Sequence, residues 1–550
     1  MENKFGEIKK EVQHPNPVSL DQELRIFNFH DNDGKKFEVV TKEVGNIDQV
    51  YEMLENNGEK KAIAPKELIL IIDAFKNCAQ LIKSCSGKEV RRSPHLLISG
   101  GFVRDILTGH IPRDIDLTTN LTSGEIYTLV KNLQGVKRVG IHGESSEVVR
   151  VKFNSGEEYE ISSFKNFEGK NRTINPGEDA GARDFTANAL FYSPLSGRII
   201  DYVGGIKDIK EKRLKFTGSA EKRIEEDGIR MLRFVRFLFK TGFSPAGEDK
   251  AIIRVLASRL KNEATERIKN ELDKILLLAP ADSALGMLDE LGLLEQIFPE
   301  VKALQNCEQR PPFHLEGNVF NHTMLVAKKL PLNANLRLKW AAIFHDIAKP
   351  ETREETEKKG KRKVSFLKHD QLGAEKVGTI LKRASFSNKE IEELKWLIAN
   401  HQALFQQVSG RIKEAGSANL DRAKNRAKAV FKKMIMDKGI DLIEDLVCLS
   451  IADLGGQISE KDDGELDQKI IKEIFFETKK ELEENKENGV DLKKLVNGKI
   501  IMETLKLKPG PEIGKIQKQV LDILLQSGEN FSDEELAKKR IRELILKLKA

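Results

Sequence analysis

The sequence has few cysteines, no long apolar segment and only a small excess of positive charge. The four cysteines among its 550 residues are Cys78, Cys85, Cys307 and Cys448, which lie too far apart for a Cys-x-x-Cys pair. Buried thiols in a reducing compartment are the simplest interpretation. No run approaches the roughly 18 apolar residues that a membrane span needs, and the N-terminus has no apolar signal core. We therefore expect a cytoplasmic protein without a membrane partner.

The balance of charge excludes a strongly acidic or basic chain. Lys and Arg total 92 and Asp and Glu total 86, which gives a formal net charge of +6. Charged residues make up 32% of the chain and hydrophobic residues 39%. This composition fits ordinary globular domains and excludes a disordered chain, a collagen and a coiled-coil rod. The net charge alone indicates no partner.

The pattern of apolar residues divides the chain into a mixed head and a long helical arm. Residues 66–83 have helical periodicity, and amphipathic helices dominate beyond about residue 220. Short strands with glycine-rich turns are predicted in between, at 95–101, 113–119, 138–143, 147–153 and 157–164. The predicted fold class is α+β, with a small mixed α/β head followed by an all-α arm.

Three further segments are interpreted from local composition. Residues 1–65 read as a separate attachment, in which strands near 24–29 and 36–41 predict a hairpin. The charged run at 351–363 has no periodic apolar face and predicts a solvated loop. A second run at 479–494 predicts a solvated helix end and a linker.

One group of residues fits a site for nucleotide phosphates. Gly100 and Gly101 stand between a predicted strand and a predicted helix, where glycine permits close approach and the helix N-terminus offers free N–H groups. Arg104, one turn later, could donate to a phosphate. Asp114 and Asp116 are two apart in the next predicted strand, so both carboxylates face one side. Paired carboxylates fit Mg2+, and a polar strand edge is the plain alternative.

Polar residues that could contact a ribose, a phosphate or a base follow downstream. Asp227 and Arg230 are three apart and share one face of a predicted helix. An acceptor beside a donor matches the pairing edge of cytosine and adenine but not that of uracil and guanine. The alternative is a surface ion pair worth less than about 1 kcal/mol. Other candidates are Arg183, Asp184 and Asn188, with Glu160 as a third carboxylate.

These motifs resemble the class II tRNA nucleotidyltransferase family, which comprises CCA-adding enzymes and bacterial poly(A) polymerases of the polymerase-β superfamily. The resemblance covers about residues 90–550 and leaves 1–65 unexplained. The matching segments are GGFVRDILTG (100–109), RDIDLTT (113–119), RDFTANALFY (183–192), DYVGGIKDIKEKRLKFTG (201–218), EEDGIRMLRFVRF (225–237), ERIKNEL (266–272) and NGKIIMETLKLKPGPEIGKI (497–516).

The resemblance implies transfer of CMP and AMP from CTP and ATP to a tRNA 3′ hydroxyl, with release of pyrophosphate. It implies that Asp114 and Asp116 are catalytic and hold Mg2+, and that Asp227 and Arg230 read the base. The other nucleotide-binding residues that it implies are Gly100, Gly101, Arg104, Arg183, Asp184, Asn188 and Arg233.

The sequence departs from the family pattern in four respects. Ala182 and Lys165 each stand at a position where the family usually has arginine. The segment from 166 to 182 is shorter than the flexible loop of typical CCA-adding members, which resembles the CC-adding subgroup. The Gly-Arg-Arg/Lys-Phe signature associated with poly(A) polymerases is missing. Full CCA addition, CC addition and poly(A) synthesis therefore stay open as alternatives.

A second group of residues fits a metal site in the helical arm. Five of the ten histidines fall between residues 314 and 401. His345 and Asp346 lie in the apolar segment AAIFHDIAKP, where a buried charge needs a partner or a metal, and Asp453 follows in SIADLGG. One histidine on an apolar helix is usually a core residue, but this concentration favours a metal.

The segments PPFHLEGNVFNHT, HDIAKP, KHDQLGAE and NHQALF resemble the HD phosphohydrolase superfamily, in the form attached to many bacterial CCA-adding enzymes. This resemblance implies a divalent transition metal ion that activates water against a phosphoester, such as a 2′,3′-cyclic phosphate or a phosphate on a damaged tRNA end. The implied primary ligands are His322, His345, Asp346 and Asp453, with His369 and His401 for a second ion or a phosphate, and His314 nearby.

The expected organisation has five parts. They are an extension (1–65), a nucleotidyltransferase head (66–218), a helical neck and body with the base-reading helix (219–298), an HD domain (299–460) and a helical tail that binds tRNA (461–550). Basic stretches at 422–428 and 538–540 could contact tRNA phosphates or be solvated helix faces. A function of another class is an HD phosphohydrolase whose head only binds RNA. The oligomeric state is not indicated.

Overall fold

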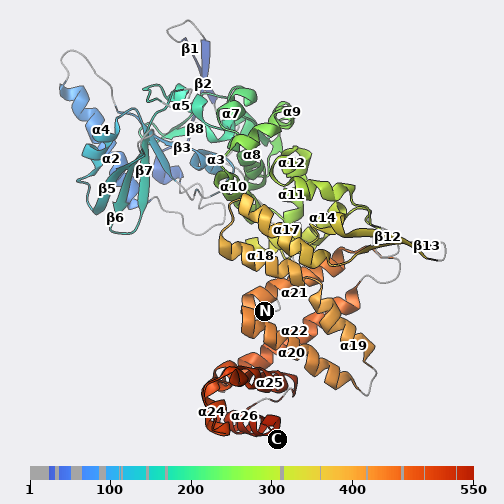
Figure 1. Cartoon of the computed structure of the whole chain (residues 1–550). Helices are drawn as coiled ribbons and strands as arrows, with labels where there is room; N and C mark the ends of the chain where they lie inside the picture. Colours follow the sequence, from blue (N-terminus) through green and yellow to red (C-terminus); the bar gives the residue numbers. More distant parts are fainter. Residues whose placement is uncertain are drawn as a thin grey trace. The chain divides into compact units, whose positions relative to one another are not determined.

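The computed structural model of the chain is shown in Figure 1. It describes residues 24–30, 36–50, 65–85, 94–110, 112, 115–143, 148–166, 171–309, 315–358, 361–415, 419–459, 464–487, 490–527, 529 and 531–549. The chain divides into two compact units between residues 263 and 264. The expected mixed head and helical arm are both confirmed. In the described part of the chain, no helix is both long and apolar enough to cross a membrane.

The first unit is built on a sheet to which nine strands of the described residues belong, in the order β1-β2-β9-β8-β3-β4-β7-β6-β5. Neighbouring strands are antiparallel, except that β4 and β7 are parallel. The strands are β1 (Leu24–His30), β2 (Lys36–Glu43), β3 (Leu96–Ser99), β4 (Asp116–Thr119), β5 (Val136–His142), β6 (Val148–Phe153), β7 (Glu158–Ser163), β8 (Leu190–Ser193) and β9 (Arg198–Asp201).

In the sequence, the helices of the first unit lie between these strands and after the last of them. Helix α8 buries the expected stripe of Ile229, Leu232 and Val235. The helices are α2 (Lys66–Cys85), α3 (Gly101–Leu107), α4 (Ser123–Val130), α5 (Pro176–Ala182), η2 (Thr186–Asn188), α6 (Gly205–Lys210), α7 (Ala220–Glu226), α8 (Ile229–Thr241), α9 (Gly247–Leu256) and η3 (Ala257–Asn262), with short strands β10 (Arg213–Leu214) and β11 (Ser244–Pro245).

The N-terminal hairpin is confirmed, but it is not a separate attachment. Strand β2 pairs antiparallel with β9, with Val40 opposite Asp201. The hydroxyl of Tyr192 on β8 donates to the carbonyl of Gly45 over 2.8 Å. The hairpin therefore extends the sheet of the head, because the edge of β9 offers backbone groups that the sequence pattern does not reveal.

The second unit is helical apart from one hairpin. Its elements are α10 (Thr265–Leu278), α11 (Ala281–Glu290), α12 (Leu293–Ile297), α13 (Pro299–Lys302), η4 (Ala303–Asn306), α14 (Val319–Lys329), α15 (Leu336–Phe344), α16 (Lys349–Thr352), β12 (Arg353–Lys358), β13 (Lys361–Phe366), α17 (His369–Arg383), α18 (Asn388–Asn400), the π-helix η5 (Phe405–Ser409), α19 (Gly410–Glu414), α20 (Leu420–Lys438), α21 (Ile440–Gly456), α22 (Glu465–Glu487), α23 (Leu492–Leu495), α24 (Gly498–Leu505), α25 (Pro511–Ser527) and α26 (Glu534–Lys549).

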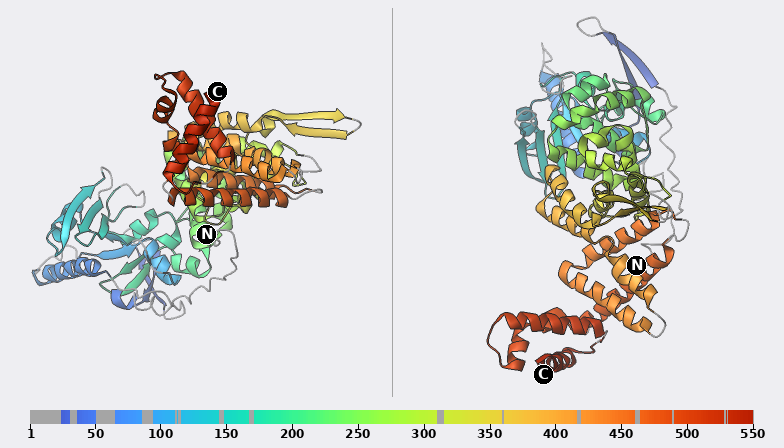
Figure 2. Two further views of the ribbon diagram at one scale, coloured as in Figure 1. Left: turned by 90° about the horizontal axis from the view of Figure 1, so that it is seen from below. Right: turned by 45° about the vertical axis from the view of Figure 1, so that its right-hand side comes forward.

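The hairpin β12–β13 corrects the prediction of a solvated loop at 351–363. Its strands pair antiparallel, with Thr356 opposite Lys363 and Glu357 opposite Arg362. The charged run thus folds back on itself as two paired strands, although it lacks the apolar alternation that predicts a strand. Figure 2 shows this hairpin extending away from the helices of its unit.

Asp201, in the DYVGG motif, fixes the turn between β9 and α6. Its carboxylate is buried and accepts hydrogen bonds from the backbone N–H groups of Val203, Gly204, Gly205 and Ile206, over 2.8–3.0 Å. A Cβ on Gly205 would lie 2.2 Å from the carbonyl oxygen of Thr186 in η2. The turn therefore holds α6 directly against η2, the element that carries Asn188.

We predict that Asp201→Ala lowers the free energy of unfolding by roughly 1–3 kcal/mol, because it leaves buried N–H donors without an acceptor. Thermal unfolding followed by calorimetry measures the effect. Asp73→Ala on the exposed side of α2 is the matched control. Equal stability of the two variants would contradict the prediction.

Candidate functional site

A glycine turn between β3 and α3 forms one edge of a pocket in the head. Gly100 has a φ of +73°, which favours glycine, and a Cβ there would lie 3.1 Å from Oδ2 of Asp116. A Cβ on Gly101 would lie 3.0 Å from Nη2 of Arg104. The two glycines therefore admit a carboxylate and a guanidinium beside the backbone.

Arg104 is held in place although it is almost fully buried, with 2% of its surface exposed. Its guanidinium donates to Oδ1 of Asp105 over 2.6 and 2.9 Å and to Oδ1 of Asn188 over 2.5 Å. It also lies over the ring of Phe237, 5.6 Å from the centroid. The structure thus brings Arg104 and Asn188 together from segments 84 residues apart.

Arg183 and Asp184 both lie beside the pocket and both engage charged partners. Arg183 donates to Oδ2 of Asp179 over 2.9 Å. The carboxylate of Asp184 contacts two residues of α8, with its Oδ1 at 3.1 Å from Nε of Arg230 and its Oδ2 at 2.5 Å from Nη2 of Arg233. Asp184 therefore joins the turn before η2 to α8.

The prediction that Asp227 and Arg230 share one face of a helix is wrong. Helix α7 ends at Glu226, Asp227 is extended with φ −159°, and α8 begins at Ile229. Oδ1 of Asp227 accepts from the N–H of Ile229 over 3.2 Å, whereas Arg230 contacts Asp184 and Glu226. Gly228 is the N-cap of α8, so Asp227 lies before this helix and Arg230 lies within its first turn.

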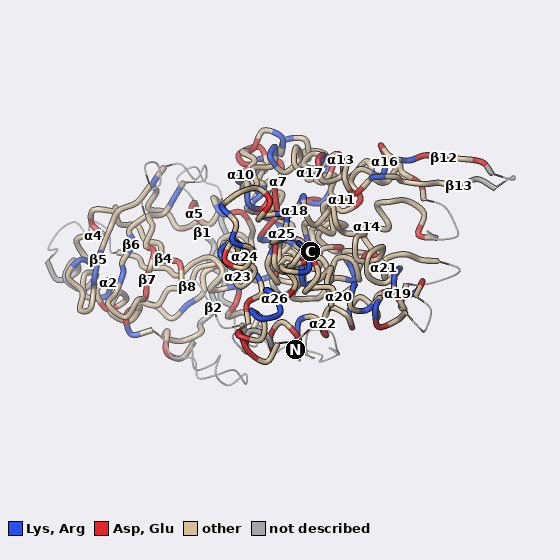
Figure 3. The backbone as a smooth tube through the Cα atoms, turned by 60° about the horizontal axis from the view of Figure 1, so that its bottom comes forward, with Lys and Arg blue, Asp and Glu red and all other residues tan. Residues whose placement is uncertain are grey.

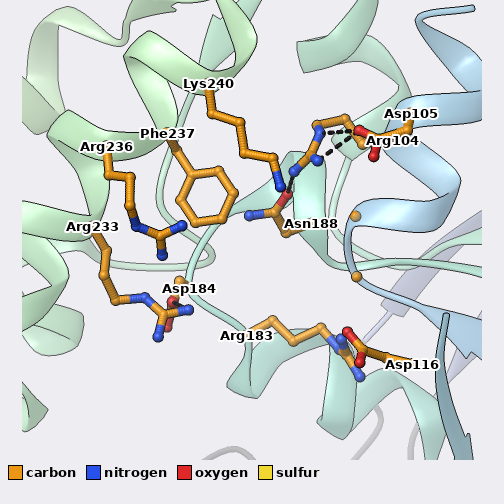
Figure 4. Close-up of a pocket in the computed structure, with 12 residues that line it drawn as sticks. Arg104, Asp105, Asp116, Arg183, Asp184, Asn188, Arg233, Arg236, Phe237 and Lys240 are labelled. Atoms are coloured by element: carbon orange, nitrogen blue, oxygen red, sulfur yellow. Dashed lines mark hydrogen bonds and ion pairs between the residues drawn. The ribbon is translucent and has the colours of Figure 1, made fainter. Parts of the chain in front are cut away.

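The pocket itself has a volume of about 370 Å3, within the range of small-molecule sites. Figure 4 shows α8 lining one side with four side chains, and Arg104 and Asp116 lie across the pocket. Three of these α8 residues, Arg236, Phe237 and Lys240, were missed by the sequence analysis. Their spacing of three, four and seven from Arg233 places them on the same helical face, which was the signal available.

Asp114 and Glu160 are the two carboxylates that the sequence predicts beside Asp116. Asp114 lies outside the described residues, so only Asp116 of the expected pair is placed. Glu160 on β7 is the register partner of Asp116 on β4, but its carboxylate forms an ion pair of 2.7 Å with Arg150. Glu160 does not line the pocket.

The second unit buries a cluster of histidines and aspartates drawn from several helices. Nε2 of His322 on α14 lies 2.9 Å from Oδ1 of Asp453 on α21 and 3.6 Å from Oδ2 of Asp346. Nε2 of His345 lies 3.1 Å from Oδ2 of Asp346. On the other side of Asp346, Oδ1 is 3.3 Å from Nε2 of His369 and 3.9 Å from Nε2 of His401. Asp346 thus stands between two groups of imidazoles. His314 lies outside the described residues.

The imidazole rings are oriented by their outer nitrogens. Nδ1 of His345, His369 and His401 donates to the carbonyls of Ala342, Phe366 and Ile398, over 2.7–2.9 Å. Because a carbonyl only accepts, Nδ1 of each of these rings carries a hydrogen. Nε2 is therefore the ring nitrogen that faces the carboxylates and that a metal would use.

Burial and neighbouring charges set the protonation of the cluster. Burial lowers the pKa of His401 to about 4, which keeps its ring neutral. Burial lowers the pKa of His322, but its interactions with the carboxylates of Asp453 and Glu316 outweigh burial and raise this pKa to about 9. Burial raises the pKa of Asp346, but His345 and Lys349 outweigh burial and keep it ionised.

The residues fit a metal ion. Nε2 of His345 is buried and has no hydrogen-bond partner among the described residues. Imidazole nitrogens and carboxylate oxygens are ligands that divalent transition metals accept. The sequence analysis missed Lys349, whose buried Nζ lies 2.7 Å from Oδ2 of Asp346 and donates to Gln309, and Glu316, which lies 3.2 Å from His322.

Three protein families match consecutive parts of the chain. Residues 96–215 match the poly(A) polymerase head domain. Residues 242–305 match the probable RNA- and SrmB-binding site of polymerase A, and residues 318–453 match the HD domain. The two sites described above fall in the first and third matches, apart from α8.

Curated relatives carry two kinds of name. Poly(A) polymerase I of Haemophilus influenzae is 31% identical over 39% of this chain, which spans 50% of that protein's length. The multifunctional CCA protein of Pasteurella multocida is 30% identical, over 47% of this chain and 64% of the relative. The A-adding tRNA nucleotidyltransferase of Deinococcus radiodurans is 27% identical, over 63% and 74%. The chain thus spans about half the length of the first of these relatives.

Solved structures match over most of the chain. The Bacillus stearothermophilus CCA-adding enzyme in complex with CTP aligns over 88% of this chain and 98% of its own, with a TM-score of 0.56 and 20% identity. The Thermotoga maritima CCA-adding enzyme complexed with tRNA aligns over 92% and 99%, with a TM-score of 0.58 and 18% identity. At this identity the similarity establishes the fold.

We predict that Lys240→Met weakens ATP binding to the full chain about tenfold, or 1.4 kcal/mol, because the substitution removes one positive charge from the pocket wall. Equilibrium titration with ATP measures the affinity. Lys261→Met on the exposed side of η3 should leave it unchanged. If Lys240→Met binds ATP as the unaltered chain does, the wall of α8 does not face the triphosphate.

Proposed function

Because the chain belongs to the nucleotidyltransferase family of poly(A) polymerases and CCA-adding enzymes, we propose that its head adds C and A from CTP and ATP to the 3′ end of tRNA. The observation that carries the proposal is the pocket in which Gly100, Gly101 and Asp116 meet the basic face of α8. Its 370 Å3 suit one nucleotide, and its basic side chains suit a triphosphate.

In this proposal each part of the pocket has one task. The glycine turn and Arg104 bind phosphate oxygens, and Asn188 keeps Arg104 in place. Asp184, Arg230 and Arg233 form one ion-paired group that positions the nucleotide base and ribose. Asp227 accepts from the N–H of Ile229 at the start of α8, and base recognition by Asp227 together with Arg230 stays a prediction.

The reaction joins RNA to the α-phosphate of the nucleotide. The 3′ hydroxyl of the RNA loses its proton to solvent water and its oxygen bonds to the α-phosphorus. The bond from this phosphorus to the bridging oxygen breaks, and pyrophosphate leaves with the bridging electrons. Asp116, together with Asp114, would hold Mg2+. When bound, this ion would reduce the electrostatic repulsion between the attacking oxygen and the triphosphate. Arg104 and the basic face of α8 neutralise the departing pyrophosphate.

For the helical unit we propose metal-dependent hydrolysis of a phosphoester at an RNA end. His322, His345, Asp346 and Asp453 would hold the primary ion, and His369 and His401 a second ion or a phosphate. A bound metal supplies an activated water. Lys349 neutralises Asp346 and lies near the same oxygen, so it limits the negative charge that a phosphoester meets.

The groove between α19, α20 and α25 is the proposed contact for tRNA phosphates. It has a volume of about 920 Å3. Its charged lining residues are Arg411, Arg422, Arg426 and Lys433, with Glu414 and with Asp522, which pairs with Lys433 at 3.1 Å. Figure 3 marks the charges along these helices. Arg422 and Arg426 are four apart on α20, where like charges weaken a helix unless an anion neutralises them. The other basic stretch is less suited, since Lys538 and Arg540 form ion pairs with Glu534 and Glu529.

We predict that the double variant Arg422→Gln/Arg426→Gln binds tRNA more weakly, with a plot of log affinity against log salt that is shallower by about 1–2. Filter binding over a series of salt concentrations measures both quantities. The matched control, Lys469→Gln/Lys480→Gln on α22, removes two exposed charges outside the groove. An unchanged salt slope would assign tRNA binding to another surface.

We predict that Asp116→Asn abolishes nucleotide incorporation while phosphoester hydrolysis survives, and that His345→Ala does the reverse. The two residues lie in different compact units. The assays use labelled nucleotides with tRNA, and a 2′,3′-cyclic phosphate substrate. Loss of both activities in either folded variant would reject two independent sites. Incorporation that persists in Asp116→Asn would show that Asp116 is not required for the reaction, whereas no incorporation by the unaltered chain would leave the head as an RNA-binding module.

Sequencing of the products separates the remaining alternatives. The substrates are tRNAs that end before, within and after CCA, each supplied with single nucleotides. Complete CCA ends support the proposal, a stop after CC supports the CC-adding alternative, and long A tails support poly(A) synthesis.

A further inference from the structure

One histidine of the buried cluster differs from the other three in what holds its outer nitrogen. His345, His369 and His401 each donate from Nδ1 to a backbone carbonyl within their own segment. Nδ1 of His322 instead lies 3.2 Å from Oε1 of Glu316. His322 is therefore the member of the cluster whose ring is set by a charged side chain.

Glu316 is itself fixed, with 2% of its side chain exposed. Its Oε2 accepts from the N–H of Ile458 over 3.1 Å. The neighbouring N–H of Leu315 donates to the carbonyl of Ile458 over 2.8 Å. These bonds tie the segment before α14 to the segment after α21, the two helices that carry His322 and Asp453.

The same two helices approach closely near this connection. A Cβ on Gly456, at the end of α21, would lie 2.8 Å from Cγ2 of Val326 and 3.1 Å from its backbone nitrogen. The close packing and the bonds around Glu316 both hold α14 against α21. They therefore fix the distance of 2.9 Å between Nε2 of His322 and Oδ1 of Asp453.

We propose that Glu316 is a positioning residue for the metal site of the helical unit. Through the contact of 3.2 Å between its Oε1 and Nδ1, its charge orients the ring of His322 so that Nε2 faces Asp346 and Asp453. Its negative charge makes that nitrogen a stronger ligand than a carbonyl would. This inference rests on the metal site proposed above and adds a residue outside its ligand set.

The test is the affinity of the metal-free full chain for Co2+, followed by the visible absorption of the bound ion. Glu316→Gln should bind Co2+ about 10–100-fold more weakly and with an altered spectrum, because the amide keeps the size of the side chain but not its charge. Glu351→Gln, an exposed glutamate paired with Lys376, is the matched control and should bind as the unaltered chain does.

Thermal unfolding of the metal-free variants separates positioning from folding. If Glu316→Gln loses its cooperative transition, Glu316→Asp provides the test, since it retains the charge but withdraws it from Nδ1, and it should also weaken Co2+ binding. Affinity within threefold of the unaltered chain in a folded Glu316 variant overturns the inference and leaves the metal site intact. Equal Co2+ binding by the unaltered chain and His345→Ala rejects the metal site itself, and with it this inference.

Discussion

The need to neutralise buried charge shapes both sites of this protein. Asp346 and Asp453 are almost fully buried, and an ionised carboxylate leaves water only when opposite charges or hydrogen-bond donors replace it. His322, His345 and Lys349 provide them from α14, from the end of α15 and from the start of α16. The packing of these helices is thus specified by polar contacts at their centre as well as by apolar surface.

In the head the buried charge is positive, and it too is matched by neighbouring groups. The buried guanidinium of Arg104 is matched by Asp105, Asn188 and the face of Phe237. Asp184 in turn matches Arg230 and Arg233. The walls of the pocket are therefore rigid before a ligand binds, and a rigid arrangement of charges costs little reorganisation when a charged ligand arrives.

Local sequence patterns predicted most of this structure, and long-range pairing marks where they failed. The strand, double glycine and helix at 96–107 follow from apolar runs and glycine, and so does the buried stripe of α8. The pairing of β2 with β9 depends on a distant partner that no local pattern names. The hairpin β12–β13 is local, but its charged strands lack the apolar alternation that predicts a strand. The spacing of Asp227 and Arg230 suggested one helix, but spacing cannot reveal a break at Gly228. Glu316 was missed because its role depends on contacts with His322 and Ile458, and Ile458 is 142 residues away.

The charge count of the buried cluster explains why it is suited to a divalent cation. Among the described residues in contact with the histidines, Asp346, Asp453 and Glu316 contribute three negative charges and Lys349 contributes one positive charge, so −3 + 1 gives −2. With a metal bound, His322 would give up the proton that its pKa of about 9 retains without one, and the imidazoles would then add nothing to this sum. A transition metal ion of charge +2 would balance it in full, whereas one added proton would balance only half. A singly charged ion would leave a buried net charge, which is unfavourable, so the arrangement of fixed charges itself favours a divalent ligand.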